Sequence, residues 1–148
     1  MSKQTEIHKS LDEVYIFWLE RVMKALKKHK AQLFKSLEID LTSDQWVVLK
    51  RCHEVQGITQ KELAESTYKD PASITRILDL LTKKTLIERR QGQDRRNFEI
   101  WLTPDGEALI KKVLPMAAKT RLEGLAGISE SENKAFIKTL EKIWNNLS

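Results

Sequence analysis

The sequence predicts a mainly α-helical protein with one small β-hairpin. Apolar residues recur at helical spacing near both ends of the chain, local motifs mark several helix starts, and one stretch alternates apolar and polar residues. With 148 residues, the chain is long enough to bury a substantial core, as one domain or as two tightly fused halves. We expect residues 1–148 to form a single domain.

Charge is unevenly distributed along the chain. The formal net charge is +5, and residues 69–96 alone hold eight Lys and Arg against four Asp and Glu. A second basic cluster lies between residues 21 and 35. Concentrated positive charge favours a polyanionic partner such as nucleic acid, although many basic proteins bind none.

The only cysteine, Cys52, excludes an intramolecular disulfide framework and suits a reducing compartment. The N-terminal residues lead into no apolar signal core, and no apolar run reaches the roughly 18 residues that a membrane span needs. We therefore expect a cytoplasmic protein that has no membrane partner.

A first long helix is predicted from Ser10 to about Lys35 by apolar residues at three- and four-residue intervals. The later helix starts are predicted by capping motifs, in which a side-chain oxygen accepts from a free backbone N–H of the first turn. Three motifs fit S/T-x-x-E/Q, and two place Pro at the first helical position: Thr42/Gln45, Thr59/Glu62, Ser129/Glu132, Asp70–Pro71 and Thr103–Pro104.

One β-hairpin is predicted between the helices that begin near residues 71 and 104. The segments LIERRQ (86–91) and NFEIWL (97–102) are its strands, and the second alternates Phe98, Ile100 and Leu102 with other residues. Gly92 suits the tight turn between them. Three short, closely joined helices precede this hairpin, at roughly 43–54, 60–67 and 71–84.

The helices at 60–67 and 71–84 are typical of a helix-turn-helix, whose second helix lies in the DNA major groove. A helical wheel separates an apolar face (Ile74, Ile77, Leu78, Leu81) from a polar face (Ala72, Arg76, Asp79, Lys83), with Ser73 and Thr75 on the flanks. Small side chains near the helix start allow close approach to base edges, where Arg76 can bind guanine through two hydrogen bonds. Taken alone, such a face is more often only a solvated surface.

The arginine pairs Arg89–Arg90 and Arg95–Arg96 change this interpretation, because they flank the hairpin tip and cannot be buried there. A helix-turn-helix followed by an arginine-tipped hairpin is a winged helix, whose tip can enter the minor groove. The negative potential of a narrow A·T-rich groove attracts arginine. We therefore predict that residues 42–103 form a winged helix-turn-helix that binds double-stranded DNA.

The segment ITQKELAESTYKDPASITRILDLLTKKTLIERRQGQDRRNFEIWLTPDGEAL resembles the MarR family of bacterial winged-helix regulators. Its most specific part, DRRNFEIWLTPDG, fits the family's D-x-R wing followed by L-T-x-x-G. The resemblance implies a homodimer with one winged helix in each subunit, joined through N- and C-terminal helices at residues 10–35 and 104–148. It also implies a transcription regulator, here expected to be a repressor.

Within this resemblance, Arg96 matches the minor-groove arginine of the wing, Asp94 matches the carboxylate that holds the wing in shape, and Arg95 is a second expected contact. The complete set of expected DNA-binding residues combines the wing with the recognition helix: Lys69, Ala72, Ser73, Thr75, Arg76, Asp94, Arg95 and Arg96.

Two positions depart from the family pattern. Thr85 stands where the family commonly has Gly after the recognition helix, and a β-branched residue is disfavoured at positive φ. We therefore expect that helix to end in a different way. Trp101, on the expected outward face of the second strand, is larger than the pattern predicts and has no assigned role.

The first and last predicted helices each carry an apolar face that needs a partner. Packing within one chain can satisfy both, but their distance in sequence from the winged helix favours exchange with a second subunit. A twofold homodimer reads two half-sites about one helical turn apart in a pseudo-palindromic operator.

Many members of the resembled family bind small, often anionic aromatic effectors between the dimer helices and the winged helix. The resemblance places such a ligand near Tyr15, Trp18 and Trp46, with a basic cluster at Lys24, Lys27, Lys28 and Lys30. The simpler interpretation is that the aromatic residues belong to the core and the lysines are solvated.

Catalytic and metal-binding interpretations have little support. Cys52 lies among Trp46, Val48 and Leu49 on the helical wheel, which indicates a buried thiol rather than a reactive one. The three histidines are far apart, so we expect no metal site and no cofactor. No phosphate-binding glycine loop or nucleophile elbow indicates an enzyme. Two alternatives to a sequence-specific regulator remain: a non-specific architectural DNA-binding protein, and a winged helix that docks to protein.

Overall fold

A computed structural model of the chain describes residues 2–94 and 96–148. The elements before the sheet core are α1 (Lys3–Ile7), the 3₁₀ turn η1 (Leu11–Glu13), α2 (Tyr15–Ser36) and α3 (Ser43–Glu54). They are followed by β1 (Ile58–Thr59), α4 (Gln60–Thr67), α5 (Pro71–Lys83), β2 (Ile87–Gln91), β3 (Phe98–Leu102), α6 (Pro104–Gly124) and α7 (Glu130–Leu147). The predicted fold class is confirmed.

Local capping positions most of these helices as predicted. Thr42 and Gln45 form a reciprocal capping box at α3, and Thr59 and Glu62 form one at α4. At the other three starts a side-chain oxygen accepts from the backbone N–H three residues ahead: Asp70 from Ser73 (3.0 Å), Thr103 from Gly106 (3.1 Å) and Ser129 from Glu132 (3.1 Å). Each motif satisfies a donor that the first helical turn leaves free.

The start of the first long helix was predicted wrongly. Ser10 does form a capping box with Glu13, but it encloses only the 3₁₀ turn η1. Val14 then adopts an extended conformation (φ −104°, ψ 130°), and the helix begins at Tyr15. The prediction rested on apolar spacing, which Leu11 and Val14 continue across the break, so the spacing alone could not locate the helix start.

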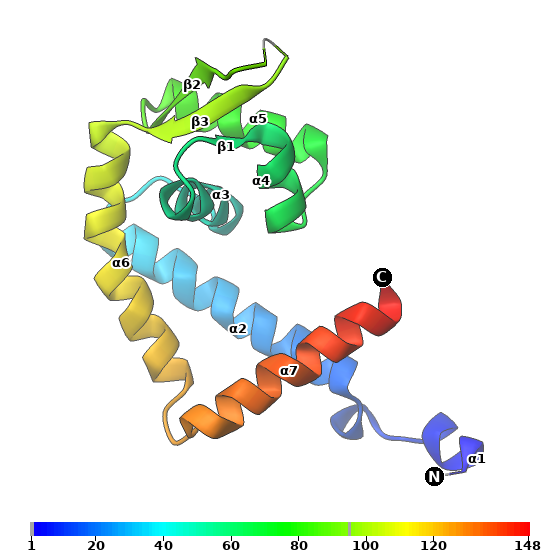
Figure 1. Ribbon diagram of the computed structural model, residues 1–148. Coiled ribbons are helices and arrows are strands. Elements are labelled where there is room, and N and C mark those ends of the chain that lie inside the picture. The colour runs from blue at the N-terminus through cyan, green and yellow to red at the C-terminus, as the bar shows by residue number, and fades with distance from the viewer. Residues whose placement is uncertain (1, 95) are drawn as a thin grey trace. The chain divides into compact units, whose positions relative to one another are not determined.

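The chain divides into two compact units, Met1–Lys111 and Lys112–Ser148, and the boundary falls within α6. In the first unit, helices α3, α4 and α5 pack together and carry the small sheet, as Figure 1 shows. The buried side chains come mainly from these three helices and from the strands, including Leu49, Leu63, Leu78 and Ile100.

The sheet has three antiparallel strands in the order β1–β3–β2. Strand β1 was not predicted, because two residues carry no period and become a strand only by pairing with β3, where Ile58 lies opposite Ile100. Strands β2 and β3 form the predicted hairpin, with Ile87 opposite Leu102 and Gln91 opposite Phe98. The hairpin extends beyond the helices of this unit (Figure 1).

Helix α5 does not end in the alternative way that Thr85 suggested. Thr85 has φ 59°, the left-handed conformation that glycine usually supplies. Its N–H donates to Thr82 O (2.9 Å), and the N–H of Leu86 donates to Leu81 O (3.0 Å). These two bonds are the Schellman pattern, so the helix ends as it would with Gly, and Thr85 bears the strain of its branched side chain.

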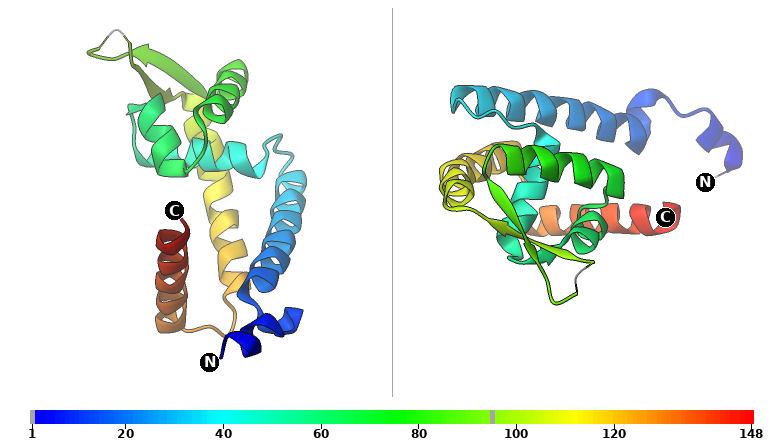
Figure 2. Two further views of the ribbon diagram at one scale, coloured as in Figure 1. Left: turned by 90° about the vertical axis from the view of Figure 1, so that its right-hand side faces the viewer. Right: turned by 90° about the horizontal axis from the view of Figure 1, so that it is seen from above.

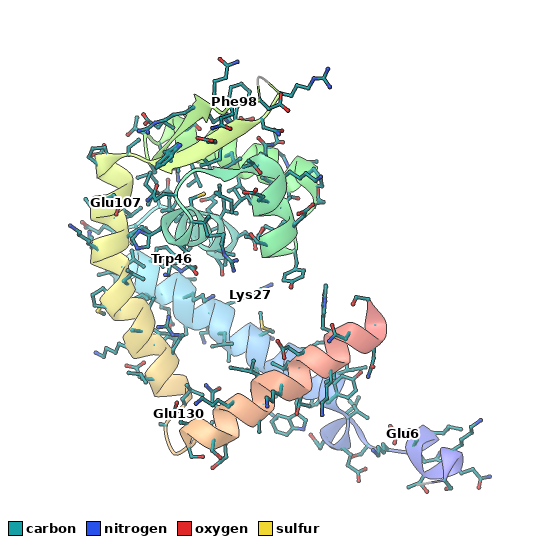
Figure 3. All side chains as sticks on the ribbon, viewed as in Figure 1. Glu6, Lys27, Trp46, Phe98, Glu107 and Glu130 are labelled. Carbon is teal, nitrogen blue, oxygen red and sulfur yellow. The ribbon has the colours of Figure 1, made fainter. Side chains whose placement is uncertain are left out.

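Gly106 explains the last position of the L-T-x-x-G pattern. A Cβ atom at this buried residue would lie 2.1 Å from the carbonyl oxygen of Leu86, so only glycine allows the start of α6 to approach the start of the hairpin. The Glu107 carboxylate, labelled in Figure 3, accepts from the amide of Gln56 (2.9 Å). These contacts join the first turn of α6 to the winged helix.

Candidate nucleic-acid interface

One face of α5 is polar and exposed, and it lies on the helix that the sequence predicts to enter DNA. Ile74, Leu78 and Leu81 are buried, as the wheel predicts, and Ile77 is half-buried. The exposed residues follow the opposite side of the helix: Ala72, Thr75, Arg76, Asp79 and Lys83. Viewed from above in Figure 2, the hairpin tip extends beyond α5 and its neighbouring helices.

A hydrogen-bonded chain organises the first turn of α5. The carboxylate of Asp70 accepts from the Ser73 hydroxyl (2.6 Å), and the Arg76 guanidinium donates to that same Ser73 oxygen (3.3 Å). The pKa of Asp70 is lowered, chiefly by the Ser73 hydroxyl and then by the Ser73 backbone N–H. The carboxylate is thus kept ionised, and Arg76 lies along the helix start.

Lys69, the residue before this cap, is bound to α3. Its Nζ lies 2.8 Å from the Asp44 carboxylate, and this hydrogen bond is the main cause of the lowered pKa of Asp44. Lys27 and Lys30 of α2 lower the same pKa further by their charge. An acidic partner therefore holds Lys69 at the edge of the interface.

Asp94 organises the hairpin tip. Its carboxylate accepts from the backbone N–H of Arg96 (3.1 Å), and its carbonyl oxygen accepts from the N–H of Asn97 (3.0 Å). The N–H of Gly92 closes the turn on Asn97 O (3.1 Å). The Arg96 side chain is exposed. Arg95, the other expected tip contact, lies outside the described residues.

The other two arginines of the hairpin lie against the protein. The Nη2 atom of Arg89 lies 2.7 Å from Asp79 Oδ1, which ties β2 to the exposed face of α5. The Arg90 guanidinium pairs with Glu88 and lies 4.8 Å from the ring centroid of Trp101. The expectation that all four arginines serve the wing tip is therefore too broad, since two of them stabilise the hairpin.

Trp101 acquires a role from these contacts. Its ring stacks with the Arg90 guanidinium and also covers Gly57, where an added Cβ atom would lie 2.8 Å from the indole. Gly57 has φ 79° and precedes β1, so the indole packs on the turn that leads into the sheet. Sequence reasoning could not find this contact, because the two residues are far apart in the chain.

The three aromatic residues expected around an effector do not lie together in the chain. Tyr15 and Trp18 lie in the first turn of α2 and are 49% and 45% exposed, whereas Trp46 is 8% exposed and packs edge-to-face on Phe34 (6.3 Å). Phe34 lies 16 residues after Trp18, or roughly 24 Å along the helix. Figure 3 labels Trp46 on α3 and Lys27 on α2.

A groove of about 1010 Å³ lies instead between α2, the loop after it and the start of α3. Three lysines line it: Lys27, Lys30 and Lys35. Its apolar lining comes from Met23, Leu26, Phe34, Ile39, Leu41 and Val47. Three carboxylates line the same groove, those of Glu38, Asp40 and Asp44. Two lysines of the expected basic cluster therefore reach a partly apolar groove whose charged side chains have both signs.

Cys52 is fully buried, and burial raises the pKa of its thiol to about 12. This confirms the core interpretation and removes the thiolate that redox chemistry requires. Within residues 2–94 and 96–148, no group of three or more metal-ligating side chains gathers in a suitable arrangement. No helix in the described part of the chain has the length and apolar character needed to cross a membrane.

Comparison with known proteins agrees with the winged-helix fold and the family resemblance. The sequence profile of the MarR family matches residues 41–98. The transcriptional regulator PA3341 is 30% identical, covers 90% of this chain and 98% of its own, and superposes with a TM-score of 0.77.

Two further structures share the fold at lower identity. The MepR–DNA complex of S. aureus is 23% identical over 91% of this chain and 99% of its own, with a TM-score of 0.82. PcaV of Streptomyces coelicolor, in complex with its natural ligand, is 19% identical over 95% of this chain and 98% of its own, with a TM-score of 0.81. The chain belongs to the MarR family of DNA-binding transcriptional regulators.

Proposed function

We propose that the protein is a homodimeric repressor that binds a pseudo-palindromic operator and releases it when a small anionic aromatic molecule binds. The observation that carries the DNA-binding part is the exposed face of α5 beside a hairpin that Asp79 and Arg89 tie to it. This arrangement can present one helix to a major groove and one arginine to the neighbouring minor groove.

Within this proposal, Arg76 reads a base edge and Arg96 enters the minor groove. Asp94 acts indirectly, since its carboxylate orders the backbone that carries Arg96. Lys69 contacts a phosphate near the start of α5 after exchanging or sharing its Asp44 partner. Ala72, Ser73 and Thr75 form the surface of the helix that lies against the bases, while Arg95 adds positive charge at the tip.

Exposed apolar side chains on two helices support a dimer. Helix α2 exposes Tyr15, Ile16, Trp18, Val22, Met23 and Leu26. Helix α7 exposes Phe136, Ile137, Trp144 and Leu147. Several exposed apolar side chains on one helix are typical of a helix that packs against a protein partner. We expect sedimentation at micromolar concentration to give a dimer, and a stable monomer would contradict the proposal.

The groove between α2 and α3 supports an effector site by its size and apolar lining, and the carboxylates beside its lysines favour a ligand that carries a donor as well as an anionic group. PcaV is a fold relative that binds a natural ligand. An effector weakens DNA binding only by preferring the conformation that does not fit DNA. Linkage then requires DNA to weaken effector binding by the same factor. Titration of benzoate- and hydroxybenzoate-type compounds with and without DNA tests this equality, and binding that never changes DNA affinity would leave a constitutive regulator.

Selection from random double-stranded DNA tests the operator-binding proposal. The full chain should enrich an inverted repeat whose half-site centres lie about 10 base pairs apart. DNA binding without any enriched sequence would indicate an architectural protein instead. The absence of salt-dependent DNA binding would indicate a winged helix that docks to protein.

A further inference from the structure

The hydroxyl group of Thr75, on the exposed face of α5, already donates its proton to a hydrogen bond within the protein. Thr75 Oγ1 donates to the carbonyl oxygen of Pro71 one turn earlier (3.0 Å), and it accepts from the side-chain amide of Gln60 (2.7 Å). A threonine hydroxyl has one proton and two lone pairs. The side chain therefore has no proton to donate to an acceptor on a base edge.

Gln60 fixes this arrangement from another helix. It is the first residue of α4 and is half-buried, and its amide crosses to α5 to reach Thr75. Two bonds from different directions hold the Thr75 side chain in one rotamer. The γ-methyl group and one lone pair of Oγ1 are then the parts of the exposed side chain that make no internal hydrogen bond.

The neighbouring positions reinforce the apolar character of this spot. The Ser73 hydroxyl donates its proton to Asp70 Oδ1 (2.6 Å) and accepts from Arg76 (3.3 Å). Ala72, three residues before Thr75 and exposed on the same helix, can offer only a methyl group. The first turns of α5 thus present two methyl groups beside the guanidinium of Arg76.

We propose that Thr75 determines sequence specificity by placing its methyl group against the 5-methyl group of a thymine, with Gln60 as the positioning residue. Thymine is the base that carries a methyl group in the major groove, where it is recognised by apolar contact. This inference rests on the proposed function, in which α5 enters that groove.

Replacing thymine by deoxyuridine tests the contact without changing the protein. Each thymine of the operator selected from random DNA is replaced in turn, and the affinity of the full chain is measured at fixed salt. Loss of the contacted methyl group should weaken binding about fourfold in one half-site and about fifteenfold when both half-sites are changed. Uracil at thymines that α5 does not reach should have no effect.

Two Thr75 variants then separate the methyl group from the hydroxyl. Thr75→Ser keeps the hydroxyl and should lose the preference for thymine over uracil at that position alone. Thr75→Val carries a methyl group on both branches of Cβ, so one can occupy the γ-methyl position without the Gln60 bond, and this variant should retain the preference. The reverse pattern, retention in Thr75→Ser and loss in Thr75→Val, would show hydroxyl recognition and overturn the inference.

Gln60→Leu tests positioning, because it removes the amide at nearly constant size. The thymine–uracil preference should fall below that of the parent protein while the melting temperature stays within a few degrees. An unchanged preference would remove Gln60 from the proposal. If uracil substitution changes the affinity at no thymine of the selected operator, the Thr75 assignment alone is overturned. If no operator can be selected, the proposed function itself is overturned.

Discussion

The Arg89 guanidinium on β2 lies 2.7 Å from the Asp79 carboxylate on α5, so one ion pair connects the two elements proposed to contact DNA. Asp79 is exposed on the same helix face as Arg76, where an unpaired carboxylate would repel phosphate. Its pairing with Arg89 both offsets this charge and holds the hairpin against the helix.

Asp79→Asn should release the hairpin from the helix. We expect hydroxyl-radical protection of the operator flanks, where the wing lies, to weaken while protection over the central major grooves remains. Overall affinity is a poor readout here, because removing a negative charge strengthens DNA binding at the same time. Arg89→Gln should give the same footprint despite the opposite change in charge, and a uniform change across the operator in both variants would contradict the role of the pair.

At the wing tip, Arg96→Ala should weaken binding most for operators whose flanks are A·T-rich, because the attraction depends on a narrow groove. Asp94→Ala should have a similar effect, since the N–H of Arg96 then loses its acceptor. Gln93→Ala, a neighbouring exposed change that leaves both groups in place, is the control. Affinities of both test variants equal to that of the parent, measured by fluorescence anisotropy, would remove the wing from the account.

Helix starts were the most predictable part of the fold, because capping depends on residues three positions apart. Thr42, Thr59, Asp70 and Ser129 all cap helices where the sequence indicates. Apolar periodicity, by contrast, placed the first long helix too early, at Ser10, where an unpredicted capping box is followed by a single 3₁₀ turn. Local motifs report how an element begins and carry little information about its length.

The candidate interface was predictable in outline but not in its pairings. Helix periodicity indicated which face of α5 is exposed, and the positions of Arg89 and Arg90 indicated a basic hairpin. Their partners, Asp79 and Trp101, depend on tertiary contacts that no short sequence pattern encodes. The bond from Gln60 to Thr75 was missed for the same reason, because it joins different helices.

Thr85 provides a test of stored backbone strain. Thr85→Gly should increase the free energy of unfolding by about 1 kcal/mol, because glycine adopts positive φ without steric cost. The gain is limited by the loss of the hydroxyl bond to Lys84 O (2.6 Å). Thr85→Val, which keeps the branch and loses the hydroxyl, should decrease stability. Urea denaturation measures both, and a less stable Thr85→Gly variant would contradict the strain.

Cys52 should make stability depend on pH in alkaline solution. Burial raises the pKa of its thiol from an ordinary 9.0 to about 12. The neutral thiol therefore stabilises the folded state fully below pH 9, and this contribution is lost as the pH rises towards 12. In that window the unfolding free energy should fall by up to about 1.4 kcal/mol per pH unit more steeply than in Cys52→Ala. Equal slopes in the two proteins would contradict the buried neutral thiol.

The most direct test of the account is competition between the selected operator and a scrambled duplex of equal length and composition at fixed salt. We expect the parent protein to bind the operator about 10³–10⁷-fold more tightly than the scrambled DNA. Arg76→Ala should cost about 1–3 kcal/mol on the operator and relax the preference at one base position in each half-site. Equal affinity of the parent protein for both duplexes, or an equal loss for every sequence in Arg76→Ala, would contradict base reading by α5.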